Sequence, residues 1–331
     1  MTVNSPYTGK PMRVVYEPET WLFRGEKYPY IHIAFRDDEN NEQFTTTESD
    51  TVCFRQVTNQ YRAKYGIPYT DEIVSLRDRY GLSAAKMSSI LGFGINQYRL
   101  YETGEVPSES NGKMIRGAMN PRVFLDLVQH SREHLSEREI EKVSARIKEV
   151  ISKADAWKNE QWATHLLFNC RRGPENGYAP QSAERLRNLL LYILEQMGEV
   201  FQTKMNKVLF YIDFLSYREC GMAISGLAYN AIDFGPVPQR WDRVYSAFDG
   251  ILPVYKLIYG QESVALKADS TSDMKYFSEP ERSVIDSVCT RMKDLSAHDI
   301  SELSHLEPAW KNNLNKPNTI PYSDAFTLVA M

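Results

Sequence analysis

Hydrophobic and polar positions alternate in short runs near the start of the chain, as in RVVYEP, WLFRG and YIHIAFR. Alternation with a period of two, interrupted by Gly and Pro, is typical of strands that bury one face. The run VCFRQVTNQYRAKYG that follows has the longer spacing of a helix. We therefore expect residues 1–69 to form a small antiparallel β unit followed by a helix.

Between residues 70 and 131 the pattern is that of several short helices. TDEIVSLRDRYGL has a helical spacing of apolar residues, with Thr70 as the expected N-cap. SAAKMSSILGF begins at Ser83, another expected N-cap, and INQYRLYETG follows a glycine-containing turn and ends at Gly104. Two short helices joined by such a turn predict a helix-turn-helix. A helical hairpin with a polar solvent face is the alternative.

The second of these short helices carries side chains that can contact DNA bases. Asn and Gln pair bidentately with adenine, and Arg pairs with guanine or reaches a phosphate. Other polar residues lie at the start of the preceding helix, where backbone phosphates would pass. The predicted DNA-binding residues are Ser83, Lys86, Asn96, Gln97 and Arg99.

Residues 132–182 contain a strongly charged run with apolar side chains at spacings of three and four. This pattern predicts an amphipathic connecting helix with a solvated outer face. Its apolar positions are Ile140, Val143, Ile147, Val150 and Ile151. The stretch NCRRGPENGYAPQS, rich in Gly, Pro and Asn, then marks a loop or domain boundary.

Residues 183–331 are expected to form a mainly helical domain. AERLRNLLLYILEQMG predicts a helix ended by Gly198, and FQTKMNKVLFYIDFLSYREC a second one capped by Gly221. AYNAIDFGPVPQRW suggests a strand running into a Gly-Pro turn, with Pro238 starting a further helix. VYKLIYG and SVALKAD are β-prone, and the tail is expected to begin as a helix and end as an extended strap. The fold class predicted for the whole chain is mainly α with a small N-terminal β unit (α+β), in several domains.

Composition excludes some classes of protein. The chain has 331 residues, more than one core usually holds, and a net charge of -4, so nucleic-acid binding requires a local basic patch. No signal-like or transmembrane segment is evident, which predicts a cytoplasmic protein with no membrane partner. The cysteines stand far apart without a C-x-x-C pair and are interpreted as free thiols: Cys53, Cys170, Cys220 and Cys289.

No nucleotide-binding, nucleophile-elbow or zinc-protease motif is present, so we predict no enzyme activity, no cofactor and no catalytic residue. One polar cluster in the tail is interpreted as helix caps, with His305 hydrogen-bonded near a helix end: His298, Asp299, Glu302, His305 and Glu307. A second set is interpreted as a solvated or paired face of its helix: Lys204, Lys207 and Asp213.

Three motifs of the last segment resemble the Panacea domain, also called the SocA-like domain, of bacterial and phage antitoxins. They are KMNKVLFYIDF, YNAIDFGPVPQRW and ELSHLEPAW, and they occur in the family's order across residues 183–326. The resemblance implies a domain that binds and neutralises a toxin directly. Aromatic residues are the expected anchors of such an interface, although each is also typical of a core: Tyr211, Tyr217, Phe234, Trp241 and Trp310.

The first two segments resemble antitoxins of the MqsA type, which have a zinc ribbon and a helix-turn-helix with the signature Y-E-x-G-x-x-P, here YETGEVP. The ribbon cysteines of that family correspond to Ser5, Thr8, Asp37 and Asn40, which lie three apart in two turns. The resemblance implies a ribbon kept without its metal, whereas plain polar turns are the alternative. In the recognition helix Asn96 matches the family, but its Arg position is Leu100.

We therefore expect an antitoxin of a bacterial or phage type II toxin-antitoxin system. A toxin and operator DNA are the expected partners, and the chain is expected to be a homodimer that represses its own operon. The expected domains are a metal-free ribbon (1–69), a helix-turn-helix (70–131), a helical linker (132–182) and the Panacea domain (183–331). The alternatives are a stand-alone transcription regulator and an adaptor that delivers a bound partner to a protease.

Overall fold

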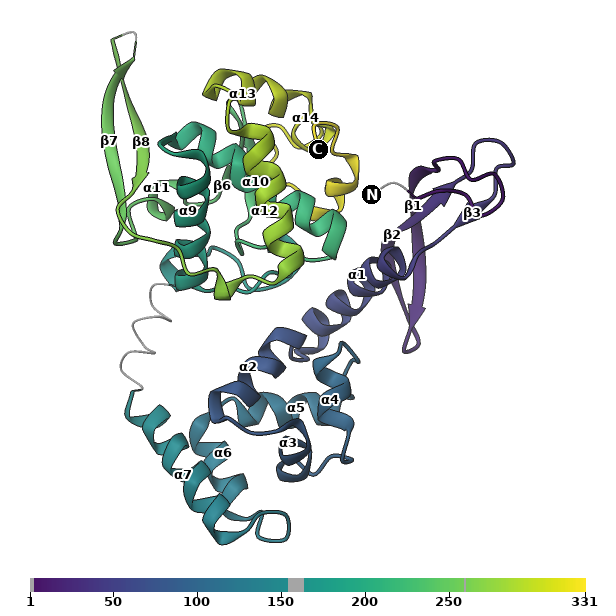
Figure 1. Ribbon diagram of the computed structural model, residues 1–331, viewed down its shortest axis with the longest axis vertical. Helices are drawn as coiled ribbons and strands as arrows, with labels where there is room; N and C mark the ends of the chain where they lie inside the picture. Colours follow the sequence, from purple (N-terminus) through teal and green to yellow (C-terminus); the bar gives the residue numbers. More distant parts are fainter. Residues whose placement is uncertain (1–2, 154–163, 259) are drawn as a thin grey trace. The chain divides into compact units, whose positions relative to one another are not determined.

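The computed structural model describes residues 3–153, 164–258 and 260–331, and Figure 1 shows its helices and strands in chain order. The described chain is mainly helical with small antiparallel sheets. The predicted fold class, mainly α with a small N-terminal β unit, is therefore confirmed.

The N-terminal sheet has three antiparallel strands, β1 (Arg13–Phe23), β2 (Glu26–Arg36) and β3 (Gln43–Phe44), in that order. Arg24 and Gly25, both with positive φ, form the two-residue turn between β1 and β2, the geometry that matches the twist of a hairpin. Helix α1 (Thr47–Tyr65) follows, and its Gln56 exchanges two hydrogen bonds of 2.9 Å with the backbone of Ile31. The predicted β unit and helix are both present.

Short helices fill the middle of the chain. They are α2 (Thr70–Tyr80), α3 (Ala84–Ile90), α4 (Gln97–Glu102), α5 (Glu109–Ala118), α6 (Pro121–Gln129) and α7 (Glu137–Ser152). Their apolar faces share one core. The N-cap of α2 is Tyr69 rather than Thr70, while Ser83 caps α3 as predicted.

Helix α7 corresponds to the predicted connecting helix, and it is amphipathic as predicted. Val143 and Ile147 are buried in the core of the middle helices, with Ile140, Val150 and Ile151 partly buried beside them. The helix therefore packs into this helical unit instead of standing between two domains. Of the rest of the predicted connecting run, residues 154–163 lie outside the described residues, and residues 164–167 are helical.

The C-terminal part is built around α10 (Gln202–Cys220), which contacts α12, α13, β6 and the 3-10 helix η3. Every residue of α10 from Lys204 to Tyr217 is buried. A helix buried on all sides is typical of the centre of a domain. The surrounding helices are α9 (Ala183–Met197), α11 (Trp241–Val244), α12 (Glu279–Met292), α13 (Ala297–Leu306), α14 (Pro308–Lys311), η1 (Pro174–Asn176), η2 (Met274–Tyr276) and η3 (Tyr322–Thr327).

Two small antiparallel sheets complete this part: β4 (Val200–Phe201), β8 (Gln261–Ala268) and β7 (Ile251–Ile258) in that order, and the hairpin β5 (Tyr229–Ile232) with β6 (Gly235–Pro238). The β-prone stretches are thus strands, and Gly198 and Gly221 end α9 and α10 as predicted. The predictions for the Gly-Pro turn and for Pro238 were wrong. The turn of the hairpin is Asp233–Phe234. Pro238 pairs with Tyr229 in the sheet, and the next helix, α11, begins only at Trp241.

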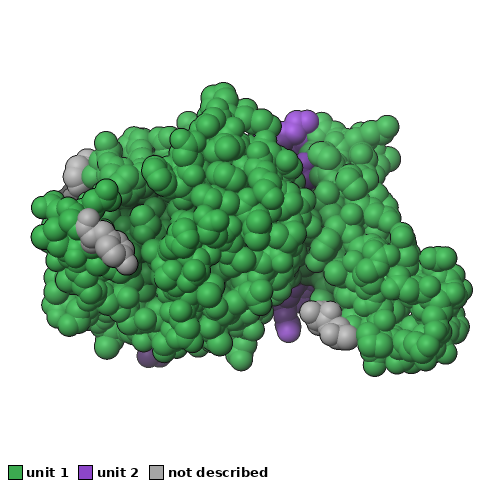
Figure 2. All heavy atoms as spheres, turned by 90° about the horizontal axis from the view of Figure 1, so that it is seen from above, with its two compact units in different colours: residues 1–57, 162–331 green, residues 58–161 purple. Residues whose placement is uncertain are grey.

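Contacts divide the chain into two compact units, residues 1–57 with 162–331 and residues 58–161, which Figure 2 colours separately. These limits differ from the predicted domain boundaries. The N-terminal sheet and the first part of α1 belong to the same unit as the C-terminal part because side chains of the two regions are in contact. The Tyr16 and Phe326 rings are 5.4 Å apart, and Arg55 donates a 3.0 Å hydrogen bond to the carbonyl of Cys220.

Among the described helices, none combines the length and the apolar character needed to cross a membrane.

Candidate functional site

Helices α3 and α4 are held together by hydrogen bonds in the interior of the helical unit. The hydroxyl of Ser88 accepts from the backbone N–H of Tyr98 at 3.0 Å, and the Tyr98 hydroxyl donates to the carbonyl of Ile73 at 2.7 Å. Tyr98 is fully buried. These contacts fix the direction in which α4 presents its exposed side.

Two of the predicted DNA-binding residues already have partners within the unit. The Ser83 hydroxyl accepts from the backbone N–H of Lys86, and Lys86 forms an ion pair with Glu139 of α7. The pKa of the Glu139 carboxyl is lowered to about 2, chiefly by the hydrogen bond from Lys86 and secondly by the hydrogen bonds from Ser136. Ser83 thus caps α3 and Lys86 joins α3 to α7, and any phosphate contact would compete with these bonds.

The other three predicted residues lie at α4. Asn96 is the exposed N-cap and Arg99 is exposed one turn further on, and neither side chain forms a hydrogen bond or ion pair within residues 3–153. Gln97 donates to Glu105 at 3.0 Å. Leu100, at the position where the resemblance to MqsA-type antitoxins implies Arg, is also exposed. Asn96 and Arg99 are thus the pair that α4 leaves available.

The YETGEVP signature has structural roles here. Tyr101 is buried and its hydroxyl accepts from Asn111 at 2.7 Å, while Glu102 forms an ion pair with Arg77. Gly104 has φ of +114°, and Arg62 donates to its carbonyl at 3.2 Å. The signature therefore fixes the turn that follows α4.

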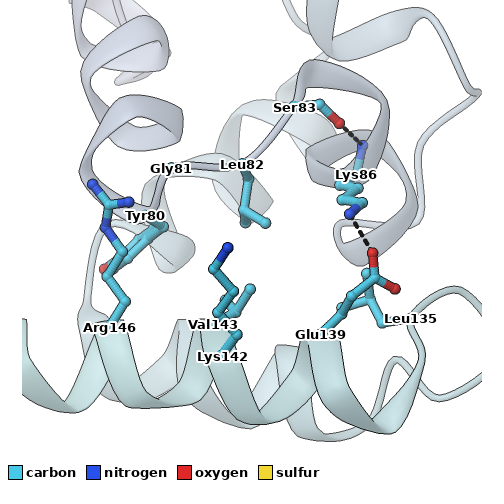
Figure 3. A pocket seen from close by; sticks show the side chains of 10 residues that line it. All are labelled: Tyr80, Gly81, Leu82, Ser83, Lys86, Leu135, Glu139, Lys142, Val143 and Arg146. Atoms are coloured by element: carbon cyan, nitrogen blue, oxygen red, sulfur yellow. Dashed lines mark hydrogen bonds and ion pairs between the residues drawn. The ribbon is translucent and has the colours of Figure 1, made fainter.

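A pocket of about 270 Å³ lies between the α2–α3 junction and α7 (Figure 3). Arg146 closes one side, because its guanidinium donates to the carbonyl of Arg79 at 3.2 Å and lies against Gly81. The pocket is lined by Tyr80, Gly81, Leu82, Ser83, Lys86, Leu135, Glu139, Lys142, Val143 and Arg146. Its three cationic side chains outnumber its one carboxylate, so it favours an anionic group such as a phosphate.

Three of the four positions that match ribbon cysteines come together. The Ser5 hydroxyl accepts from the backbone N–H groups of Tyr7 and Thr8 at 3.2 Å, and Thr8 donates to Asp37 at 3.0 Å. Donors on Ser5 and then Glu39 hold the pKa of the Asp37 carboxyl below its usual value. The side-chain oxygen of Asn40 instead accepts a hydrogen bond from the backbone N–H of Glu42. Hydrogen bonds thus link the two turns.

The Panacea-like motifs converge around α10, where they bury charged side chains. Asp213 is fully buried and accepts from the backbone N–H groups of Ile224 and Ser225, at 2.8 and 2.7 Å, and from the Ser225 and Tyr229 hydroxyls. Burial raises the pKa of the Asp213 carboxyl, and these donors oppose the rise. Asp213 therefore fixes the loop that follows α10.

Two further buried charges have comparable structural roles. Glu307 accepts from the backbone N–H groups of Val329 and Ala330, at 2.9 and 3.0 Å. Lys204 donates to the carbonyls of Lys293 and Leu295, at 2.8 and 2.6 Å. Each charge therefore ties a distant part of the chain to the centre of the domain.

Lys204, Lys207 and Asp213 were predicted to form a solvated or paired face of their helix; Lys204 and Asp213 have hydrogen-bond partners, but the prediction of a solvated face was wrong. All three are buried, because α10 is covered on every side. Lys207 differs from the other two, since its ammonium group forms no hydrogen bond or ion pair with the described residues. Burial alone lowers the pKa of Lys207 to about 8.

The predicted aromatic anchors divide into two groups. Tyr211 and Tyr217 are buried in the core, so the structure leaves them no accessible surface for a partner. Phe234 at the β5–β6 turn is 74% exposed, Trp241 is exposed, and Trp310 is partly so. Trp310 donates to the carbonyl of Ile232 at 2.8 Å, which fastens α14 to the hairpin.

Four partly or fully exposed side chains lie on the β5–β6 hairpin and on the α13–α14 segment that the Trp310 bond joins to it, and we call them the hairpin patch: Ile232, Phe234, Leu306 and Trp310. The ring of His305 stacks on Trp310, with centroids 4.3 Å apart. Its Nε2 atom is buried without a hydrogen-bond partner in the described chain, unlike the helix-end contact expected for it. Asp299 is part of the cap of α13, as expected.

Within residues 3–153, 164–258 and 260–331, no three His, Cys, Asp or Glu side chains are grouped so as to hold a metal ion. The four cysteines are free, and burial raises the pKa of each thiol.

Comparison with known proteins bears on one part of the chain. A family model described as "Antitoxin SocA-like, Panacea domain" matches residues 205–311. No curated protein and no solved structure gives a significant match. The predicted Panacea resemblance is therefore confirmed over this region, which runs from α10 to α14, and it indicates an antitoxin role.

Sequence reasoning missed the special position of Lys207. The repeated Lys in KMNKV was visible, but both lysines were assigned to a solvated or paired face of their helix. The available signal was the nearly continuous apolar run VLFYIDFL after Lys207, which is typical of a helix covered on all sides.

Proposed function

We propose that the protein is an antitoxin of a bacterial or phage type II toxin-antitoxin system. In this proposal the C-terminal domain neutralises a toxin by binding it, and the helix-turn-helix binds operator DNA, as a homodimer, to repress the operon. The observation that carries the proposal is the Panacea match over residues 205–311. Neutralisation by binding also agrees with the structural roles of Asp213, Glu307 and Lys204 described above.

The hairpin patch is the surface that we propose for the toxin. Aromatic side chains that remain exposed on a folded domain are typical interface anchors. Phe234 is the most exposed of the predicted aromatics and projects from a hairpin that Trp310 holds in place. Trp241 follows the same hairpin in the chain and is a second candidate.

Co-expression tests the antitoxin role. The chain is produced together with each protein encoded next to it, and growth rescue and co-purification are scored. Rescue with a stable complex supports the proposal. A set of harmless, non-binding neighbours contradicts it and favours a stand-alone regulator.

A matched pair of variants tests the surface. Phe234→Ala should weaken toxin binding by about 2 kcal/mol or more if Phe234 is an anchor. Tyr255→Ala is the control, because Tyr255 is an aromatic on β7 with the same 74% exposure. Equal losses in both variants, or none in either, would contradict the assignment.

The half-life of the toxin in cells separates a blocker from a proteolysis adaptor. An antitoxin that only blocks the toxin leaves the half-life of the toxin unchanged or lengthens it. Removing such an antitoxin therefore does not lengthen the half-life of the toxin. A half-life that lengthens when the antitoxin is removed would favour the adaptor.

The proposed DNA contacts are those of Asn96 and Arg99, supported by the absence of competing partners for their side chains within residues 3–153. Binding to DNA from upstream of the gene is measured at several salt concentrations. If Arg99 contacts a phosphate, Arg99→Ala should reduce the salt dependence by about one unit of slope. Arg122→Ala is the control, since Arg122 is exposed on α6 of the same unit.

A further inference from the structure

Several charged side chains of the described residues are buried around α10, and those of Asp213, Glu307 and Lys204 have their hydrogen-bonding needs met. Asp213 accepts four hydrogen bonds, Glu307 accepts two from backbone N–H groups, and Lys204 donates two to carbonyls. Lys207 is 1% exposed and has no partner among the described residues. It is therefore the exception within a set that otherwise follows the rule for buried charges.

A buried ammonium group without a counter-charge destabilises a folded protein. Burial is the only cause that lowers the pKa of Lys207, to about 8, and no carboxylate opposes it. At neutral pH the amine is therefore still mostly protonated. A negative charge brought to this point would remove the penalty.

The neighbours of Lys207 show where such a charge could arrive. A methyl group placed on Gly235 would lie 2.8 Å from its Cε atom and 3.3 Å from Nζ. Gly235 directly follows Phe234, so the end of the lysine lies at the base of the turn that carries this exposed ring. The same methyl group would lie 2.6 Å from the hydroxyl oxygen of Ser304. That hydroxyl already donates to the carbonyl of Ser301 at 2.8 Å.

We propose that Lys207 receives the carboxylate of an aspartate or glutamate side chain of the toxin, while apolar residues beside that carboxylate pack on the hairpin patch. The inference rests on the proposed function, because it assigns the chemistry of the toxin surface. The site offers one ammonium group, that of Lys207, and the hydroxyl of Ser304 is already used in another hydrogen bond. A carboxylate, with a single negative charge, fits such a site better than a phosphate, which needs more hydrogen-bond donors. The long lysine side chain can extend toward the surface when the carboxylate binds.

The free protein provides the first test, with Lys207→Met and Lys204→Met as a matched pair. Both substitutions remove a buried charge from the same helix, but only Lys204 has carbonyl partners. Thermal melting of the full chain at neutral pH should show Lys207→Met more stable than the original protein, and Lys204→Met less stable. Equal destabilisation by both would overturn the inference, because it would mean that Lys207 is structurally satisfied.

Acetate is the probe for the carboxylate site. In full-length protein with ¹⁵N-labelled lysine, the Lys207 ammonium signal is identified by its loss in Lys207→Met. Titration with acetate should shift this signal, while chloride at the same ionic strength should not. The absence of an acetate-specific shift would overturn the site.

The toxin found by co-expression provides the last test. Lys207→Met should weaken its binding at least about tenfold, and so should the change of one acidic toxin residue to its amide. Unchanged binding by Lys207→Met would overturn the inference and leave the proposed function standing. If the original protein binds no neighbouring gene product, the proposed function fails, and the carboxylate can then no longer be assigned to a toxin even if acetate binds.

Discussion

Charged side chains between the helices of the helical unit and those around α10 are placed differently. In the helical unit, ion pairs such as Lys86–Glu139 and Arg116–Glu72 join neighbouring helices at partly exposed positions. Around α10, charged groups are buried and are satisfied mainly by backbone atoms. Both sets contain lysine and carboxylate side chains, but those of the first set are partly exposed to water and those of the second are buried.

This difference determines what each region can do with a charge. An exposed ion pair contributes little to stability and can exchange its partner for a phosphate with little loss. A buried charge cannot exchange partners in this way, since an unpaired state in the interior is costly. Exchangeable ion pairs are compatible with the DNA binding proposed for the helical unit, while a buried charge near the hairpin patch favours one specific counter-charge.

The largest expected effect comes from removing a satisfied buried charge. Asp213→Ala should lower the free energy of unfolding by about 3–5 kcal/mol, because four donors lose their acceptor inside the domain. Urea unfolding measures this loss. Asp233→Ala, at an exposed carboxylate of the β5–β6 turn, is the control and should change stability little. A loss below about 1 kcal/mol for Asp213→Ala would break the comparison between the two regions.

The next effect has the opposite sign and depends on pH. The pKa of Lys207 is about 8 in the folded chain against 10.5 ordinarily, so the unfolded chain binds more protons between these values. Lys207→Met should therefore stabilise the protein by roughly 3 kcal/mol near pH 7, and by about half of that near pH 9.5. Urea unfolding at both pH values checks this. A stabilisation that grows with pH would contradict it.

A smaller effect is expected in the helical unit. Asn96→Ala should weaken operator binding by about 1–3 kcal/mol if Asn96 pairs with a base, and it should leave the melting temperature unchanged because the side chain is exposed. Fluorescence anisotropy and thermal melting measure the two quantities. An unchanged affinity would remove Asn96 from the set of base-contacting residues.

No effect is expected from a metal chelator. The turns at Ser5 and Asp37 are joined by hydrogen bonds between Ser5, Thr8 and Asp37, none of which is a thiolate ligand. Thermal melting with and without EDTA should coincide. Bound zinc found by elemental analysis, together with a lower melting temperature in EDTA, would contradict the interpretation of a metal-free ribbon.

Much of the fold could be predicted because local signals agree with the final packing. Ser83 caps α3 and Gly221 ends α10, and both effects depend on residues close in sequence. The hairpin at Gly235 could not be predicted in the same way. Gly-Pro suggests a turn locally, but the pairing of Pro238 with Tyr229 extends the strand. Pairing between strands depends on tertiary contacts that no short window contains.

The candidate site shows the same limit. Asn96, Gln97 and Arg99 were predicted to lie on the exposed side of their short helix; Asn96 and Arg99 are exposed, and Gln97 is partly exposed. Lys207 was assigned to a solvated or paired face because charged residues on an amphipathic helix usually lie on one. Its burial arises from α12, α13, β6 and η3, which surround α10 and come from later parts of the chain. The partners of a buried charge are thus a property of the assembled domain.

The hydrogen-bonded turns around Ser5, Thr8 and Asp37 have a consequence for the conditions in which the β unit can fold. A ribbon that depends on zinc requires a supply of the metal and loses its ligands when thiols are oxidised. Hydroxyl and carboxylate groups are insensitive to both. The β unit should therefore keep its structure during zinc starvation or oxidative stress, when a metal-dependent ribbon would unfold.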